Sequence, residues 1–176
     1  MAATILNLDT ANLFLGDDDP DDSQFLALSS VKLPNLEEAV KEHTPGGGVG
    51  TIEIPMRKLN AIALTFSLMG MAPDALSMFM AARRQNYTVR GNMFDLASQN
   101  DIPVVGVVFG RMTKVEVSDF KKDDGVSTDY EIKGVMRYRL TIGGREKFFY
   151  DALQGPRGVR IDGVNPFARV ARNIGL

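Results

Sequence analysis

The sequence of 176 residues contains no cysteine. This absence excludes disulfide bonds, zinc sites built from thiolates and cysteine nucleophiles. The single histidine, His43, excludes a histidine-rich metal site and leaves one residue for any histidine relay. No segment approaches the roughly 20 apolar residues of a membrane-spanning helix, and no basic stretch followed by an apolar run marks a secretory signal. We therefore expect a soluble protein made in the cytoplasm, without stable membrane insertion.

The motifs that could carry chemistry are incomplete. His43 precedes a glycine-rich segment with Gly46, Gly47 and Gly48, but the Gly-Lys-Ser/Thr of a phosphate-binding loop is missing. An acidic segment at residues 17–22 lacks the glycine and the closing glutamate of a calcium loop. We predict a mobile loop at residues 43–51, a solvated acidic turn at 17–22, and no catalytic, cofactor-binding or metal-binding residues.

The charges that are present divide unevenly along the chain. Residues 1–56 hold ten acidic and two basic side chains, a net charge of −8, whereas residues 57–176 hold eighteen basic and twelve acidic ones, a net charge of +6. Such asymmetry is typical of nucleic-acid faces or of complementary patches that bring one copy of a protein onto the next. The acidic part argues against the nucleic-acid face.

Alternation of apolar and polar residues dominates the chain and predicts strands. One strand is expected from Ile62 to Leu68, and a much longer one from Tyr130 to Ile142 would span roughly 40 Å. The turn signal Gly143-Gly144 then predicts a hairpin that returns through residues 145–150. Shorter strands are expected at residues 12–15, 24–33, 51–56 and 87–95.

A further run from Pro103 to Val117 is expected to pair antiparallel with the long strand, across the loop at residues 121–125. Its alternation places on one face Val105, Val107, Phe109, Val115 and Val117.

One helix is predicted at residues 73–84, because Pro73 suits a first turn and three apolar residues, Leu76, Phe79 and Met80, share a face. The fold class is therefore mainly β (α+β), an antiparallel sandwich or barrel with a long hairpin and one short helix. We expect a single domain over residues 1–176.

The C-terminal segment, Arg157–Leu176, interleaves apolar side chains with arginines. Phe167, Ile174 and Leu176 alternate with Arg169 and Arg172, so the segment would expose apolar surface if it were left in water. We expect it to pack either on its own core or on a neighbouring subunit.

Several segments together resemble a known family. In chain order they are Asn12–Gly16, Val31–Glu37, Leu64–Gly70, Val107–Val117, Tyr138–Glu146 and Ala171–Leu176. Their order and spacing resemble the major tail tube proteins of contractile-tailed phages, the P2-like group. The sequence departs from that pattern in its dense acidic segment at 17–22 and in Gly46–Gly48, where an arginine-bearing lead is more usual.

The resemblance implies a tail tube fold shared with secretion-system tubes, hexameric rings stacked into a tube inside a contractile sheath, and no catalysis. Its implied partners are further copies of itself, the tail sheath protein, the baseplate and the tape measure protein, while DNA passes through the lumen without specific binding. The location implied is the virion tail, with assembly in the host cytoplasm. The candidate self-assembly residues are His43, Gly46, Gly47, Gly48, Tyr130, Ile132, Met136, Tyr138, Phe167, Arg169, Arg172, Ile174 and Leu176.

Two expectations concern the assembled tube. The lumen should be neutral or acidic, without a ring of unpaired Arg137 and Arg139, because a basic bore would retard DNA. The acidic front or the glycine loop of one ring should approach the basic C-terminal segment of the next. The alternatives are a tube subunit of a phage-derived bacteriocin or secretion system and, more remotely, a monomeric binding module or a hydrolase that uses His43.

Overall fold

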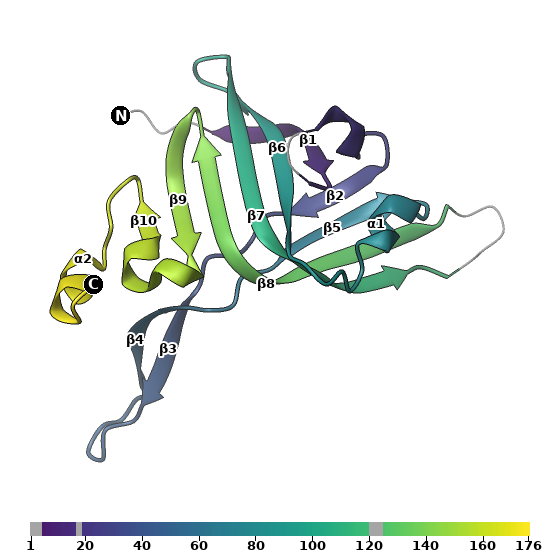
Figure 1. Ribbon diagram of the computed structural model, residues 1–176. Helices are drawn as coiled ribbons and strands as arrows, with labels where there is room; N and C mark the ends of the chain where they lie inside the picture. The colour runs from purple at the N-terminus through teal and green to yellow at the C-terminus, as the bar shows by residue number, and fades with distance from the viewer. Residues whose placement is uncertain (1–4, 17–18, 120–124) are drawn as a thin grey trace.

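The computed structural model describes residues 5–16, 19–119 and 125–176, most of which form antiparallel strands (Figure 1). Asp17 and Asp18 of the acidic segment and residues 121–124 of the expected loop lie outside the described residues. The main sheet has the strand order β1-β6-β7-β8-β5-β2, and β9 and β10 continue it from β8. Its strands are β1 (Leu6–Phe14), β2 (Leu28–Lys32), β5 (Leu64–Met69), β6 (Gln85–Asp95), β7 (Asn100–Val117), β8 (Ser127–Ile142), β9 (Arg145–Asp151) and β10 (Val159–Ile161).

The long strand β8 pairs with β7 over most of its length and with two other strands in turn on its opposite edge. Its first half pairs with β5 and its second half with β9. Between these halves three residues of β8 lie opposite one residue of β7, and Gly134 in this bulge has φ +58°, a conformation that favours glycine. The unusual length expected for this strand is confirmed. The structure explains the length, because one edge of β8 pairs with β5 and then with β9.

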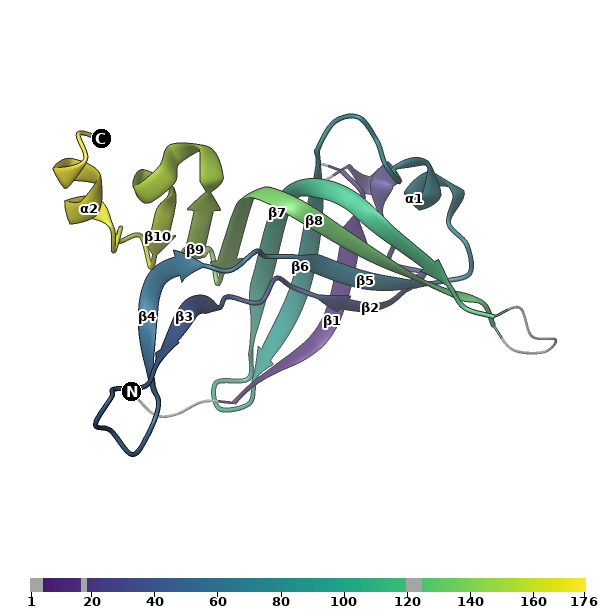
Figure 2. The same ribbon diagram turned by 90° about the horizontal axis from the view of Figure 1, so that it is seen from below.

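The core is formed by side chains of this strongly curved sheet, which Figure 2 shows from below. Phe66 of β5 stacks on Tyr130 of β8, with 4.9 Å between the ring centroids, and Tyr138 packs against Phe148 at 5.8 Å. Burial raises the pKa of Tyr138 to about 12, and burial raises that of Tyr87 to about 12 as well. The hairpin of β8 with β9 and the antiparallel pairing of β7 with β8 agree with the predictions.

The buried face of β7 is not the face that carries most of its large side chains. Val104, Val108 and Met112 are buried, whereas the face with Val105, Val107 and Phe109 is only half-buried. The buried face also carries two glycines whose missing side chains leave room for neighbours. A Cβ at Gly106 would lie 2.7 Å from Leu33 Cδ2, and one at Gly110 would lie 2.8 Å from Ile132 Cγ2.

The helix expected at residues 73–84 is shorter, since α1 spans only Pro73–Ser77. Met80 adopts φ +55° and its N–H points to the carbonyl of Met112 at 3.4 Å, so the chain leaves the helical path towards β6. Leu76, Phe79 and Met80 are exposed, and Ala75 is the residue of α1 that is buried. Expecting one helix was also wrong, because α2 (Ala168–Asn173) forms a second.

The expected strand at residues 24–33 begins only at Leu28, because the η1 turn (Pro20–Asp22) and a further tight turn precede it. An unexpected strand, β3 (Glu38–His43), pairs with β4 (Ile52–Leu59) in a separate two-stranded sheet. His43 is therefore the last residue of a strand, opposite Ile52, rather than a loop residue. In Figures 1 and 2 this hairpin projects from the body of the molecule.

Candidate assembly surfaces

The β3–β4 hairpin is exposed over nearly all of its residues. An isolated two-stranded hairpin is marginally stable in water, yet this one leaves several large apolar side chains uncovered. They are Val40, Ile52, Ile54 and Met56. The hairpin therefore presents apolar surface that only a contact outside the protomer could cover.

The tip of this hairpin holds the predicted residues His43, Gly46, Gly47 and Gly48, all of them exposed. A Cβ added at Gly46 or Gly47 would meet no atom within 4 Å. The hydroxyls of Thr44 and Thr51 lie 2.9 Å apart across the base of the tip. No described residue packs on Gly46 or Gly47, so their small size is not required by the fold of a single copy, whereas a Cβ at Gly48 would lie 3.3 Å from the ring of Pro45.

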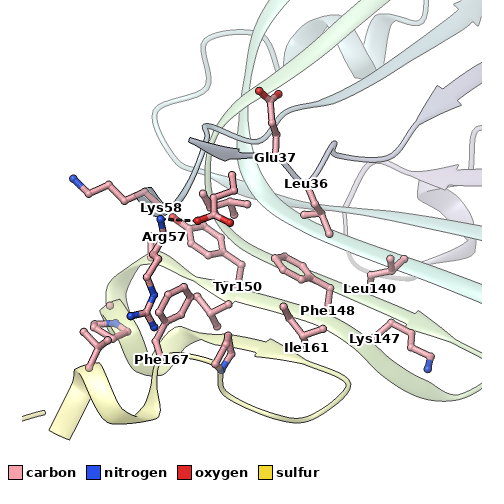
Figure 3. A pocket seen from close by; sticks show the side chains of 18 residues that line it. Leu36, Glu37, Arg57, Lys58, Leu140, Lys147, Phe148, Tyr150, Ile161 and Phe167 are labelled. Atoms are coloured by element: carbon pink, nitrogen blue, oxygen red, sulfur yellow. Dashed lines mark hydrogen bonds between the residues drawn. The ribbon is translucent and has the colours of Figure 1, made fainter. Parts of the chain in front are cut away.

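An apolar groove of about 960 Å³ lies at the base of the hairpin (Figure 3). Its floor is formed by β9, and its walls come from the ends of the hairpin, from β10 and from the C-terminal segment. The apolar side chains that define it are Leu36, Leu59, Phe148, Ile161, Phe167 and Val170. These residues are distant in sequence, so sequence patterns gave no signal that they would meet.

Charged residues surround this groove. Arg57 lies over the ring of Phe167, with 5.4 Å from its guanidinium carbon to the ring centroid, and its backbone N–H donates to the carboxylate of Glu38 at 2.6 Å. Arg57 also adopts φ 55°, which is strained for a residue other than glycine. Lys58 and Glu37 point outward from the rim in Figure 3. The Arg57 contact ties the hairpin to the C-terminal segment.

The C-terminal segment packs on its own protomer through few of its side chains. Ala171 is buried and Asn165 donates to the carbonyl of Pro156 at 3.0 Å, while Phe167 is half-buried against Arg57. The other predicted residues of the segment are exposed, namely Arg169, Arg172, Ile174 and Leu176. A single copy therefore leaves much of the apolar surface of this segment in contact with water.

The predicted residues on β8 lie elsewhere. Tyr130, Ile132 and Tyr138 are buried inside the protomer, because their face of β8 forms the core, and Met136 is half-buried beside the bulge. Their side chains are thus not available to a second copy on the surface of this protomer. The structure does not bring them together with the hairpin tip or with the C-terminal segment as one exposed surface.

The opposite face of β8 and β9 carries arginines that each have an acidic partner. Arg137 lies 3.3 Å from Asp151, and Arg139 lies 3.5 Å from Glu146, which also accepts hydrogen bonds from Arg160 at 2.8 and 3.1 Å. The hydrogen bond from Arg160 holds the pKa of Glu146 below its usual value. Arg137 and Arg139 are therefore paired in the protomer.

Asp151 is the buried acid of this network. Burial raises its pKa, but this is outweighed by hydrogen bonds from the Gln154 side chain and the Leu153 N–H and by the charge of Arg137, so the pKa is lowered overall. Asp151 therefore stays ionised and also caps the η2 turn (Ala152–Gly158).

Two surfaces were missed by sequence reasoning. The first half of β1 pairs with β6 on one side and has an unpaired edge on the other over the described residues. A tight turn before β2 exposes Phe25 and Leu26. A signal for the turn was present, since two large apolar residues follow the acidic stretch after only Ser23 and Gln24, but this segment was predicted as part of a strand.

Within residues 5–16, 19–119 and 125–176, no group of three or more histidine, aspartate or glutamate side chains is placed to hold a metal ion. Among the helices of the same ranges, none is long and apolar enough to span a membrane.

Comparisons with known proteins agree on the fold. The family model described as phage tail tube protein FII matches residues 7–175. The chain is similar to the sheath/tube terminator of an extracellular contractile injection system, PVC, at 12% identity and a TM-score of 0.53, over 80% of this chain and 99% of that one. It is also similar to a chain of the PVC sheath-tube complex, at 12% identity and a TM-score of 0.49 over 75% and 88% of the two chains. No curated protein matches the sequence.

Proposed function

The chain belongs to the family of phage tail tube protein FII, and we propose that it forms hexameric rings that stack into the inner tube of a contractile tail. It is a structural tail tube protein by this membership, and the family match over residues 7–175 is the observation that carries the assignment. The antiparallel β fold, few helices and similarity to a tube terminator are consistent with it. What we propose beyond family membership is that six copies form a ring and that the rings stack.

The free strand edges support closure into a ring. β9 and β10 branch from β8, so the edge of β1 and the edge formed by β9 and the short β10 terminate the path β1-β6-β7-β8-β9-β10. Unpaired edges invite uncontrolled pairing with other chains, and a closed barrel removes them. Pairing of one edge with the other edge of the next copy would continue the sheet around a ring.

The role we propose is passage of DNA through the bore without catalysis and without specific binding. We place towards the lumen the face of β8 and β9 on which Arg137, Arg139 and Arg160 have acidic partners. Paired arginines offer few free positive charges to phosphates, so DNA would move without salt-sensitive retention. The outer surface and the ends of the tube would meet the sheath protein, the baseplate and the tape measure protein, in the virion after assembly in the host cytoplasm.

A second candidate is a tube subunit of a contractile injection system or bacteriocin. The fold similarity to the PVC sheath/tube terminator favours it, because that protein shares the fold at nearly full length. The two candidates differ in cargo and not in the protomer. Particles purified from cells that produce the whole gene cluster would contain DNA in a head in the first case and lack it in the second.

Negative-stain electron microscopy of the purified chain tests the proposal directly. We expect six-fold rings and short stacks at high protein concentration, and fewer of them on dilution. Analytical ultracentrifugation at the same concentrations provides an independent mass. A particle that stays monomeric at every concentration would contradict the proposed function.

A further inference from the structure

Phe25 and Leu26 are the most unusual exposed side chains of the acidic front. They are 62% and 83% exposed and adjacent in sequence, at the corner of the turn Gln24–Ala27. Single exposed apolar residues are common, but a pair presented on a tight turn is typical of a contact surface. We call this feature the Phe25–Leu26 turn.

The turn is held firmly by the backbone. The N–H groups of Ala27 and Leu28 both donate to the carbonyl of Gln24, at 3.0 and 2.8 Å, and the N–H of Gln24 donates to the carbonyl of Leu13 at 2.8 Å. The Asn12 amide and the Ser23 hydroxyl add a side-chain hydrogen bond at 2.9 Å. Because the exposed pair is already positioned, a partner would not have to order it, which lowers the entropic cost of binding.

The charges around the turn and around the groove are opposite. Residues 19–28 contain Asp19, Asp21 and Asp22 and no basic residue. The groove described above is lined by three basic residues, Arg57, Lys58 and Lys147, and by two acidic ones, Glu37 and Glu38. Residues 152–176 beside it contain four arginines and one aspartate, so the surroundings of the groove carry a net positive charge. An apolar turn with an acidic border thus faces an apolar groove with a net positive border.

The two surfaces cannot meet within one copy. In Figures 1 and 2 the start of β2, where the turn lies, is on the side of α1, whereas β10 and α2 lie on the opposite side of the molecule. We propose that the Phe25–Leu26 turn of one copy seats in the groove of a second copy. The proposal rests on the proposed tube function and adds the contact that orients neighbouring copies. Because the two surfaces differ, the contact is head-to-tail and leaves each copy with one surface free for the next.

The other apolar cluster on the side of α1 fits the groove less well. It contains exposed residues around α1, including Met71, Leu76 and Met80, and it is followed by the exposed Arg83 and Arg84. These arginines have the same sign as those of the C-terminal segment, so their approach to the groove would be repulsive. The observations therefore favour the acidic turn as the occupant.

Disulfide cross-linking tests the contact sharply, since the chain contains no cysteine of its own. Ile161 lines the groove and is 52% exposed, so Leu26→Cys and Ile161→Cys are both surface substitutions. A mixture of the two single variants under mild oxidation should give a cross-linked dimer in non-reducing electrophoresis. A chain that carries both substitutions should give a ladder of multimers, since every copy offers both ends. The matched control is Leu96→Cys, 55% exposed on the turn between β6 and β7, which should not cross-link to Ile161→Cys.

A second variant gives a readout that does not depend on cysteine. Phe25→Ser with Leu26→Ser should leave the urea unfolding midpoint unchanged, because both side chains are exposed, and should reduce rings and stacks at least tenfold. The proposal is overturned if wild-type chains form rings while this variant assembles equally well and Leu26→Cys fails to cross-link to Ile161→Cys. It is also overturned if Met80→Cys cross-links to Ile161→Cys in place of Leu26→Cys. Failure of the wild type to form rings is a different result, which contradicts the tube function itself.

Discussion

The central sheet buries its large apolar side chains, whereas the region around the β3–β4 hairpin leaves many of them exposed. In the sheet, β5, β7 and β8 bury one face densely, with stacked rings and glycines that admit neighbouring side chains. In the hairpin, the groove and the C-terminal segment, apolar side chains of comparable size remain in water. The first region stabilises a single copy, whereas the exposed apolar side chains of the second would be buried by the contacts with other copies that we propose. The difference separates residues that determine folding from residues that we propose to act in assembly.

The largest effect is expected from a core aromatic residue. Phe66→Ala removes a buried ring stacked on Tyr130 and should lower the free energy of unfolding by about 3–5 kcal/mol, measured by urea denaturation. The matched variant in the hairpin, Met56→Ala, should cost less than about 0.5 kcal/mol because its side chain is exposed. Equal losses of unfolding free energy in the two variants would contradict the distinction between the two regions.

A pH titration should unfold the sheet selectively at alkaline pH. The pKa of Tyr138 is about 12 in the folded chain and 10.0 in the reference state, so its protonated form is favoured by folding. The stabilisation is complete below pH 10 and is lost as pH rises from 10 through 12, up to about 2–3 kcal/mol. Tyr138→Phe should reduce the alkaline decline in urea unfolding curves between pH 9 and 12 and leave the part that Tyr87 contributes. Residues 38–59 contain no tyrosine, so the hairpin adds nothing to this decline.

Two glycines provide a comparison with the same chemical change. Gly110→Ala places a Cβ 2.8 Å from Ile132 Cγ2 and 3.2 Å from the carbonyl of Lys133, and should cost about 1–3 kcal/mol. Gly46→Ala meets no atom within 4 Å and should leave the thermal midpoint nearly unchanged. Its effect should fall on ring formation, observed by electron microscopy. A Gly110→Ala chain as stable as the wild type would show that the core is less tightly packed than the distances indicate.

A small effect on folding is expected from truncation after Arg172. Removal of Asn173–Leu176 deletes exposed side chains and the backbone hydrogen bonds that the N–H groups of Ile174, Gly175 and Leu176 donate at the chain end, so the free energy of unfolding should change by less than about 1 kcal/mol. Assembly into rings and stacks should nevertheless weaken clearly in sedimentation experiments. If the truncated chain did not fold as a monomer, the C-terminal segment would instead be part of the core that stabilises a single copy.

The strands with strong alternation could be predicted from the sequence because one face of each is buried. The β8–β9 hairpin also carries its own turn signal, Gly143-Gly144, with φ 57° and 75°. Strand β3 was missed because exposure on both sides of the hairpin leaves no apolar period to detect. The end of α1 depends on a backbone contact between Met80 and Met112, which no local pattern reports.

The candidate site was harder to predict than the fold. Alternation placed Tyr130, Ile132 and Tyr138 on one face of a strand, but it could not distinguish burial in the core from burial between copies. The groove depends on residues from Leu36 to Val170 that converge only in three dimensions. Local composition predicted the hairpin tip and the C-terminal segment as assembly surfaces, and most of their side chains are exposed in one copy, as the exposure of Ile174 and Leu176 indicates.

The continuity of β8 has a mechanical consequence. One covalent strand joins the β5–β2 part of the sheet to the β9–β10 part, and β7 lies beside both halves. A load applied along the strand direction at one end therefore passes to the other through main-chain bonds. Sliding β8 past β7 would require many of the hydrogen bonds between them to break together, because a force along the strands acts on all of these bonds at once. A subunit built in this way resists stretching along β8, and the bulge at Gly134 is a point where this strand can bend.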